Sequence, residues 1–244
     1  MPDDYTFTSG PDDDERTADR RGPAMESTKR VARGVLAIWN DRRAGTETEY
    51  EAWYRGEHLP ERLSIPGFRA AWRYRVVDGE PEYFTFYETT TPEVLFSEPY
   101  LKRVENPTEL TRRIMSGTFT NATRALLTRV ARWGMLRGVF AVSVRFDSKP
   151  DSFLESRLRT IASRDDALST ELWTLTSADA PAVLSAEQRL RGPDKSVAAA
   201  ALVETTTEQE ARAVAAALRT ALGANPHIGV YRLFCSLDRE DLDL

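Results

Sequence analysis

Two kinds of hydrophobic pattern alternate along the chain from residue 34 onward. Short segments rich in β-branched and aromatic residues are typical of strands, and segments whose apolar residues recur every three or four positions are typical of helices. In the first half of the chain these patterns predict strands over residues 34–40, 68–77, 83–89 and 124–133, and helices over residues 48–59 and 91–104. Residues 106–121 follow a less regular pattern. The predicted order of elements in this half is therefore β-α-β-β-α-β.

The helix predicted over residues 48–59 carries large side chains at spacings of three and four, which place them along one broad stripe. These residues are Tyr50, Trp53, Tyr54, Glu57 and His58. Because the residue before a proline is disfavoured in the helical conformation, we expect Pro60 to end or kink this helix just after His58. The segment Asp78-Gly79-Glu80-Pro81 predicts a hairpin between the second and third strands.

The same order of elements is predicted again in the second half. Residues 137–142 match residues 33–38 at four of six positions, with an offset of 104 residues. Strands are predicted over residues 138–146, 168–176, 197–205 and 227–236, and helices over residues 152–164 and 208–223. The alternative is a coincidental short match, but the shared order and equal spacing favour a duplicated ferredoxin-like unit. Such a sheet leaves one face uncovered, so we expect an α+β fold in which two tandem β-α-β-β-α-β repeats pack sheet to sheet as a closed α/β barrel.

Composition separates a tail from these two units. Residues 1–30 contain eight acidic and five basic residues and little aliphatic content, which predicts a disordered acidic tail. Met25 could equally be the initiator. The expected domains are therefore the tail at 1–30, one repeat at 31–134 and a second repeat at 135–244.

Charge and residue counts exclude several classes of function. The net charge of −5 argues against nucleic-acid binding, and no apolar run reaches the ~18–20 residues of a membrane span, so a cytoplasmic protein without a membrane partner is expected. Cys235 is the one cysteine, and with two histidines it makes a poor zinc-ligand supply. There is no glycine-rich phosphate loop, so neither a metal nor a nucleotide cofactor is expected. Whether two chains form a homodimer stays open.

Residues 102–137 hold a local excess of basic side chains, eight against two acidic ones. In the predicted strand Arg124 and Arg132 share one face and Arg129 takes the other, so the excess does not form one stripe. A solvated surface is the first interpretation, and a funnel for an anionic substrate is the second.

The segment from Trp53 to Leu63 (Trp-Tyr-Arg-Gly-Glu-His-Leu-Pro-Glu-Arg-Leu) and the turn Ile65-Pro66-Gly67-Phe68 resemble the EthD-like members of the dimeric α/β-barrel superfamily. Tyr100-Leu101, Asn106-Pro107-Thr108 and residues 111–115 add to the resemblance, which covers residues 33–133. The helix predicted over residues 152–164 has neither the histidine nor the proline at the corresponding place. One functional pocket with a degenerate partner half is therefore expected.

The resemblance implies a superfamily of small-molecule binders and cofactor-independent enzymes, including monooxygenases, polyketide cyclases, dehydratases and muconolactone isomerase-type proteins, besides haem-using branches. Imidazole exchanges protons near neutral pH, so His58 is the candidate general acid/base, and Tyr54, one turn earlier, is its candidate partner. The alternative is a structural role, in which His58 caps the kinked helix end and binds a free backbone carbonyl.

Aromatic residues concentrated in the first half are the candidate ligand-binding set: Trp39, Trp53, Trp72, Tyr74 and Tyr87. Along the second strand, Trp72, Tyr74 and Val76 alternate with Arg73, Arg75 and Val77, and the sequence leaves open which set faces the barrel interior. Inward aromatics favour a ring-bearing ligand, inward arginines favour a carboxylate, and ordinary core packing is the alternative for each aromatic. The leading hypothesis is a protein that binds an apolar or aromatic, carbonyl-bearing small molecule. A non-catalytic binding or accessory protein and an oligomerisation module are the alternatives.

Overall fold

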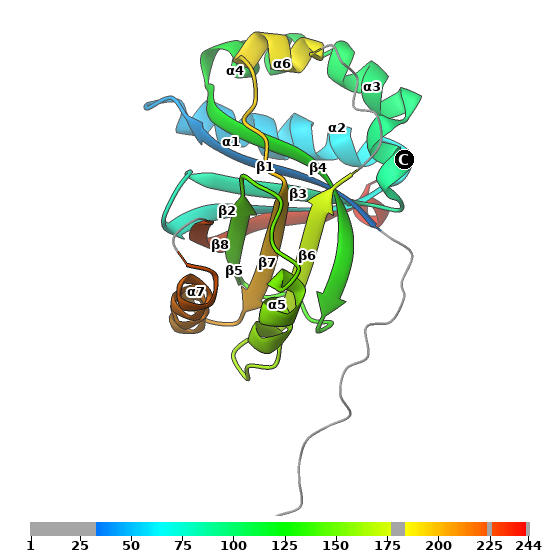
Figure 1. The fold of residues 1–244 in the computed structure, drawn as a ribbon. Helices are drawn as coiled ribbons and strands as arrows, with labels where there is room; N and C mark the ends of the chain where they lie inside the picture. Colours follow the sequence, from blue (N-terminus) through cyan, green and yellow to red (C-terminus); the bar gives the residue numbers. More distant parts are fainter. Residues whose placement is uncertain (1–32, 177–183, 224–225, 243–244) are drawn as a thin grey trace, which may run out of the picture.

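Eight antiparallel strands form a closed barrel in the computed structural model, which describes residues 33–176, 184–223 and 226–242 (Figure 1). The strands are β1 (Arg33–Arg42), β2 (Phe68–Asp78), β3 (Tyr83–Thr89), β4 (Phe119–Trp133), β5 (Phe140–Phe146), β6 (Ser169–Leu175), β7 (Ala199–Thr205) and β8 (His227–Asp238). Their order around the barrel is β1-β3-β2-β8-β5-β7-β6-β4. The predicted tail lies outside the described residues.

Each half of the chain contributes four adjacent strands in the same relative order. The first half forms β4-β1-β3-β2 and the second forms β8-β5-β7-β6. Antiparallel pairs β2–β8 and β4–β6 join the two sheets along both edges. The predicted fold class is confirmed, and the barrel closes within a single chain.

Helices cover the outer face of the barrel in two separate layers (Figure 1). The layer on the first half contains α1 (Glu47–Trp53), the π-helical turn η1 (Tyr54–His58), α2 (Leu59–Ser64), the 3-10 turn η2 (Pro92–Phe96), α3 (Glu98–Glu105) and α4 (Glu109–Gly117). The layer on the second half contains α5 (Leu154–Ala162) and α7 (Glu208–Leu222), and the short turn η3 (Arg239–Asp241) follows β8. None of the helices within the described ranges is long and apolar enough to cross a bilayer.

An additional helix, α6 (Ala186–Arg191), lies in the connection from β6 to β7. It belongs to the second half in sequence, but it packs against α3 and α4 of the first half (Figure 1). Ser185 caps it with a reciprocal capping box that includes Gln188. The sequence patterns did not predict this helix.

Of the two outcomes expected at Pro60, an end or a kink of the first helix, the structure shows a π-helical turn that ends at His58 and a further helical turn after it. The helical segment runs on through Pro60 to Ser64. Leu59 stays in the helical region, and its backbone N–H donates to the carbonyl of Tyr54, five residues earlier, which widens the turn. Pro60 then occupies the first turn of α2, where a missing N–H costs little.

The region after β3 is more broken than predicted. The expected helix over residues 91–104 divides at Ser97, because Pro99 begins a new first turn inside α3. The irregular segment 106–121 contains α4, whose cap Thr108 accepts a hydrogen bond from the backbone N–H of Thr111 at 3.0 Å. Helices α3 and α4 both contribute side chains to the cavity described below.

The barrel interior is filled by side chains from both halves. On β2 the aromatic set faces inward, whereas Arg73 lies on the helix side of the sheet, where its guanidinium is 3.6 Å from the ring centre of Tyr54. The interior cluster contains Val35, Ala37, Trp39, Tyr74, Phe84, Phe86, Ala125, Leu127, Ala141, Trp173, Val197, Ala200, Leu202 and Tyr231, with Trp72, Val76 and Leu233 at its margin. Stacked rings such as Trp39 on Phe84, 5.1 Å apart, leave this region packed.

The basic residues of β4 do not form the solvated surface expected first. A register shift between Arg129 and Ala131 brings Arg129 to the same carboxylate as Arg132, that of Glu171, at 3.5 and 3.4 Å. Arg137 also reaches Glu171 at 3.0 Å and Glu204 at 2.7 Å. These arginines therefore form a partly buried ion network at one mouth of the barrel.

Candidate functional site

His58 lies at the end of the π-helical turn, between the sheet and the helix layer of the first half, and only 5% of it is exposed. Its ring stacks on Trp53 with 4.2 Å between ring centres and meets the edge of Tyr54 at 5.2 Å. The predicted Tyr54–His58 pairing is thus a contact between rings. The π turn places these three side chains together, because it shifts His58 relative to a regular helix.

Polar contacts from α4 fix the neighbouring residues of this turn. The indole N–H of Trp53 donates to the hydroxyl of Thr111 at 2.9 Å. Glu57 accepts from the hydroxyls of Thr108 and Thr111, at 2.5 and 2.8 Å. Glu57 therefore points toward α4, as its position next to His58 in the helix requires.

A small cavity of about 20 Å³ lies beside His58. That is room for about one water molecule. Its lining combines apolar, phenolic and charged side chains: Leu36, Ile38, Tyr54, His58, Arg62, Tyr87, Tyr100, Met115, Phe119, Arg124, Glu187 and Arg191.

Three buried polar atoms at this cavity have no hydrogen-bond partner within the described part of the chain. They are His58 Nδ1, the Tyr87 hydroxyl and Arg62 Nη1. A buried polar group without a partner costs about 1–3 kcal/mol, so such groups are rare and concentrate where something else satisfies them. The alternative in which His58 binds a free backbone carbonyl is not observed at Nδ1, because that atom has no hydrogen-bond partner among the described residues.

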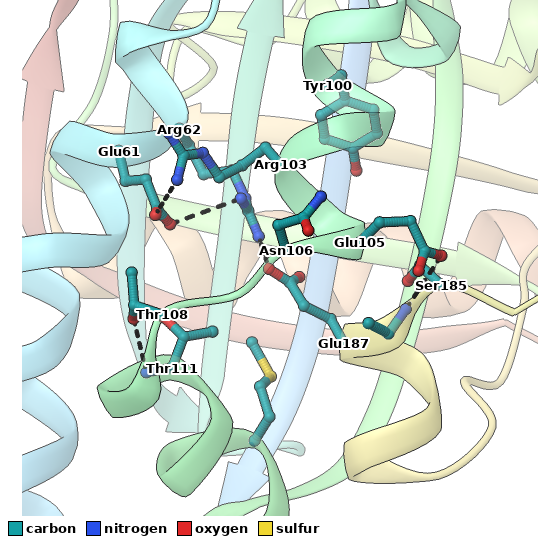
Figure 2. Close-up of polar contacts among 12 residues, drawn as sticks. Glu61, Arg62, Tyr100, Arg103, Glu105, Asn106, Thr108, Thr111, Ser185 and Glu187 are labelled. Carbon is teal, nitrogen blue, oxygen red and sulfur yellow. Dashed lines mark hydrogen bonds and ion pairs between the residues drawn. The ribbon is translucent and has the colours of Figure 1, made fainter.

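The charged groups of the cavity come from both halves of the chain (Figure 2). Arg62 on α2 forms a very short, buried ion pair with Glu187 on α6. Arg191 on α6 pairs with Asp194 at 2.7 Å and lies 3.9 Å from Glu187. Arg124 on β4 donates to the phenol of Tyr100. Helix α6 thus closes the cavity and supplies its one lining carboxylate.

The electrostatic environment holds His58 neutral and the arginines charged. Burial lowers the pKa of His58 well below its ordinary value, and the charges of Arg62, Arg73 and Arg191 lower it further. Burial also opposes the charge of Arg62, but Glu187 and other groups outweigh it and raise its pKa. The pKa of the Tyr87 phenol is raised well above its ordinary value, mainly by burial.

The predicted site residues fall on two faces of the sheet. Tyr54, His58 and Tyr87 line the cavity, and Trp53 lies behind His58. The other three candidate ligand-binding residues, Trp39, Trp72 and Tyr74, lie in the packed barrel interior or at its margin. The inward aromatics therefore do not form one pocket with His58. The sequence analysis did not assign Arg62 or Glu187 to the site.

A second hollow of about 220 Å³ lies at the opposite mouth of the barrel and contains exposed charged groups. There His227 lies 3.1 Å from Asp147, and Lys195 donates to Asn121 at 3.0 Å. Among the described residues, no three His, Cys, Asp or Glu side chains gather as a metal site. Cys235 is half-buried, and burial raises the pKa of its thiol.

The arrangement of strands and helices is similar to that of several solved structures. An anthrone oxidase-like protein matches with a TM-score of 0.56 and 10% identity, over 89% of this chain and 97% of that one. A provisionally named monooxygenase from Fusobacterium nucleatum subsp. nucleatum matches with a TM-score of 0.52 and 10% identity, over 86% and 98%. A provisionally named chlorite dismutase matches with a TM-score of 0.50 and 12% identity, over 84% and 96%.

The chain has the dimeric α/β-barrel fold. At these identities the likeness concerns the fold alone. No family model matches the sequence, and no curated protein matches it.

Proposed function

We propose that this protein, as an EthD-like α/β barrel, binds a small apolar or aromatic, carbonyl-bearing molecule in the cavity beside His58. The observation that carries the proposal is a neutral, buried imidazole that lines a small cavity and whose Nδ1 atom has no hydrogen-bond partner among the described residues. Phenolic and apolar side chains around it suit a ring, as in most small-molecule sites. Structural neighbours named for oxygenation and oxidation support small-molecule chemistry in this fold.

His58 acts in this proposal as a general base and then as a general acid. A neutral imidazole has one acceptor nitrogen, and Nδ1 can take a proton from the carbon next to the ligand carbonyl. The C–H electrons pass into an enolate, whose oxygen accepts hydrogen bonds from the Tyr87 hydroxyl and Arg62 Nη1. Return of the proton to another carbon completes an isomerisation. If the ligand carries a β-hydroxyl group, the enolate electrons expel it and the proton leaves with it as water, which completes a dehydration. If the ligand carries a second carbonyl, the enolate carbon bonds to that carbonyl carbon and the proton goes to its oxygen, which completes a cyclisation. Tyr54 positions the imidazole through its ring contact.

A non-catalytic binding or accessory role is the second candidate. The cavity in this arrangement has room for about one water, so in either role a ligand must displace Glu187 or α6 to enter. A carrier that encloses its ligand needs the apolar walls and the polar anchors but no proton transfer.

The test is a fragment screen by NMR with aromatic ketones and phenols, followed by His58→Gln and His227→Gln variants. His227 is exposed at the barrel mouth and is the matched control. For an enzyme, His58→Gln should abolish exchange of the ligand's α-hydrogen for deuterium while affinity changes less than about tenfold. A carrier should show no exchange in any variant. The binding proposal fails if no fragment shifts the resonances of His58 or Tyr87.

A further inference from the structure

We infer that the cavity takes a ligand with a carboxylate or similar anionic group, and that the Glu187 side chain occupies the place of that group in the closed protein. This ligand class deepens the proposed function and depends on the cavity being a binding site. The inference starts from charge, burial and the origin of the groups involved.

The cavity holds more buried positive charge than its own carboxylate balances. Arg191 is already neutralised by Asp194, to which two of its nitrogens donate at 2.8 and 2.7 Å. Arg124 has a phenol as its hydrogen-bond partner and no ion pair with any described carboxylate. Glu61 lies 3.8 Å from Arg62 but is also bound by Arg103 at 2.8 Å, and Glu187 also lies 3.9 Å from Arg191. The three carboxylates of Glu61, Glu187 and Asp194 are thus shared among four guanidinium groups, those of Arg62, Arg103, Arg124 and Arg191. Buried charges are normally paired, so this site favours an additional anion.

Glu187 is attached to the cavity in a way that a ligand could reverse. It sits on a two-turn helix from the other half of the chain, and α6 is also tied to α3 by an exposed ion pair between Arg189 and Glu105 at 2.9 Å. Exposed pairs of this kind contribute only about 0.2–1 kcal/mol. The Arg62–Glu187 pair is therefore the main charged contact that holds α6 over the cavity (Figure 2).

An anionic group that replaced Glu187 would meet donors that Glu187 leaves unused. Arg62 Nη1 and the Tyr87 hydroxyl have no hydrogen-bond partner among the described residues, although Nη1 lies 3.8 Å from the Glu61 carboxylate and Nη2 is bound to Glu187. A ligand carboxylate could use both guanidinium nitrogens of Arg62 in the bidentate geometry that arginine favours. Its attached ring or chain would then lie against Met115, Phe119 and Tyr100.

Calorimetric titration with benzoate and benzamide tests this inference, because the two probes share a ring and differ in charge. Glu187→Gln keeps the side-chain shape and removes the competing charge. We expect it to tighten benzoate binding at least about tenfold while benzamide changes less than about twofold. Glu105→Gln is the control, since it weakens the attachment of α6 without changing the cavity charge. It should shift both probes by the same small factor.

Three outcomes would overturn the inference. Equal gains for benzoate and benzamide in Glu187→Gln would mean that the variant only opens the cavity. An unchanged benzoate affinity would mean that Glu187 does not compete with an anion. Binding of benzamide at the His58 cavity with no binding of benzoate would leave the proposed function standing and remove the anionic ligand class. If neither probe nor any screened fragment shifts the His58 resonance, the proposed function fails as well.

Glu187→Ala gives a second test that holds even if the glutamine variant folds poorly. The alanine variant lacks Cγ, Cδ and both carboxylate oxygens, which are the heavy atoms of acetate. Acetate should therefore raise its melting temperature more than acetamide does, and the two compounds should have equal effects on Glu105→Ala. Equal stabilisation of Glu187→Ala by both compounds would contradict a carboxylate-specific place beside Arg62.

Discussion

His58 couples the protonation of a single side chain to the stability of the protein. Its pKa is lowered in the folded state, chiefly by burial, whereas the unfolded chain has the ordinary value of about 6.5. Below that pH the unfolded state binds more protons than the folded state, so protonation favours unfolding. The free energy of unfolding is therefore unaffected by His58 titration above pH 6.5 and decreases as the pH falls below it. His58→Gln should therefore lose less stability between pH 7.5 and pH 5 than the wild type, by at most about 2 kcal/mol. Urea unfolding at the two pH values measures this, and identical acid dependence in both proteins would contradict it.

The imidazole itself gives a direct measurement at the same scale. The chain has two histidines, so His227→Gln leaves a single imidazole resonance and assigns it to His58. Titration of that resonance should show a midpoint well below the ordinary pKa. A midpoint at or above the ordinary value would show that His58 is not enclosed as described.

The residues of the cavity were only partly predictable from the sequence. Tyr54 and His58 share a helical stripe, and the motif around them is distinctive, so they could be found from local spacing. Glu187 lies 125 residues from Arg62, in a connection without a periodic pattern, and no local signal joins the two. Alternation along β2 divided Trp72 and Tyr74 from Arg73, but the direction of the two sets depends on the curvature of the closed barrel.

At the scale of elements, α6 is short enough that its cap should matter. Ser185 accepts from the backbone N–H of Gln188, and Thr207 makes the same reciprocal capping box at the start of α7. Loss of such a cap costs about 1 kcal/mol. We expect Ser185→Ala to speed amide hydrogen exchange in α6 several-fold and to leave α7 unchanged. Thr207→Ala is the matched control and should do the reverse, and faster exchange in α6 from Thr207→Ala would refute the local origin of the effect.

The elements also show where pattern and chemistry disagree. The eight strands lie close to their predicted positions, because β-branched and aromatic segments bounded by turns are strong local signals. The rule for Pro60 marks the place of an irregularity but not its kind, since a π turn before the proline lets the helical segment continue to Ser64. Prolines inside helical patterns mark such turns as well as ends.

At the scale of the whole molecule, equivalent positions of the two halves make equivalent contacts. A side chain on Gly34 would lie 2.2 Å from the Thr89 hydroxyl, and one on Gly138 would lie 2.3 Å from the carbonyl of Thr205. These contacts explain why both positions are glycine, and we propose on this ground that the chain is a duplication with domains at 31–134 and 135–244. The indole of Trp39 donates to Ser143, the residue at the same place in the second half, at 2.9 Å.

The ion network at the barrel mouth joins the halves, and Glu204 is its most buried member. It accepts hydrogen bonds from Tyr74 of the first half at 3.0 Å and from Arg137 at 2.7 Å. Removal of one partner from a buried ion pair costs about 3–5 kcal/mol, and Glu171 remains beside Arg137 to offset part of this. Glu204→Gln should therefore lower the free energy of unfolding by about 2–3 kcal/mol.

Because the strands close one barrel, both halves should unfold in a single transition, measured by urea titration with tryptophan fluorescence and circular dichroism. Glu208→Gln, in an exposed pair on α7, is the control and should change stability by less than about 0.5 kcal/mol. Two separate transitions in the wild type, or equal losses in the two variants, would show that the network does not couple the halves.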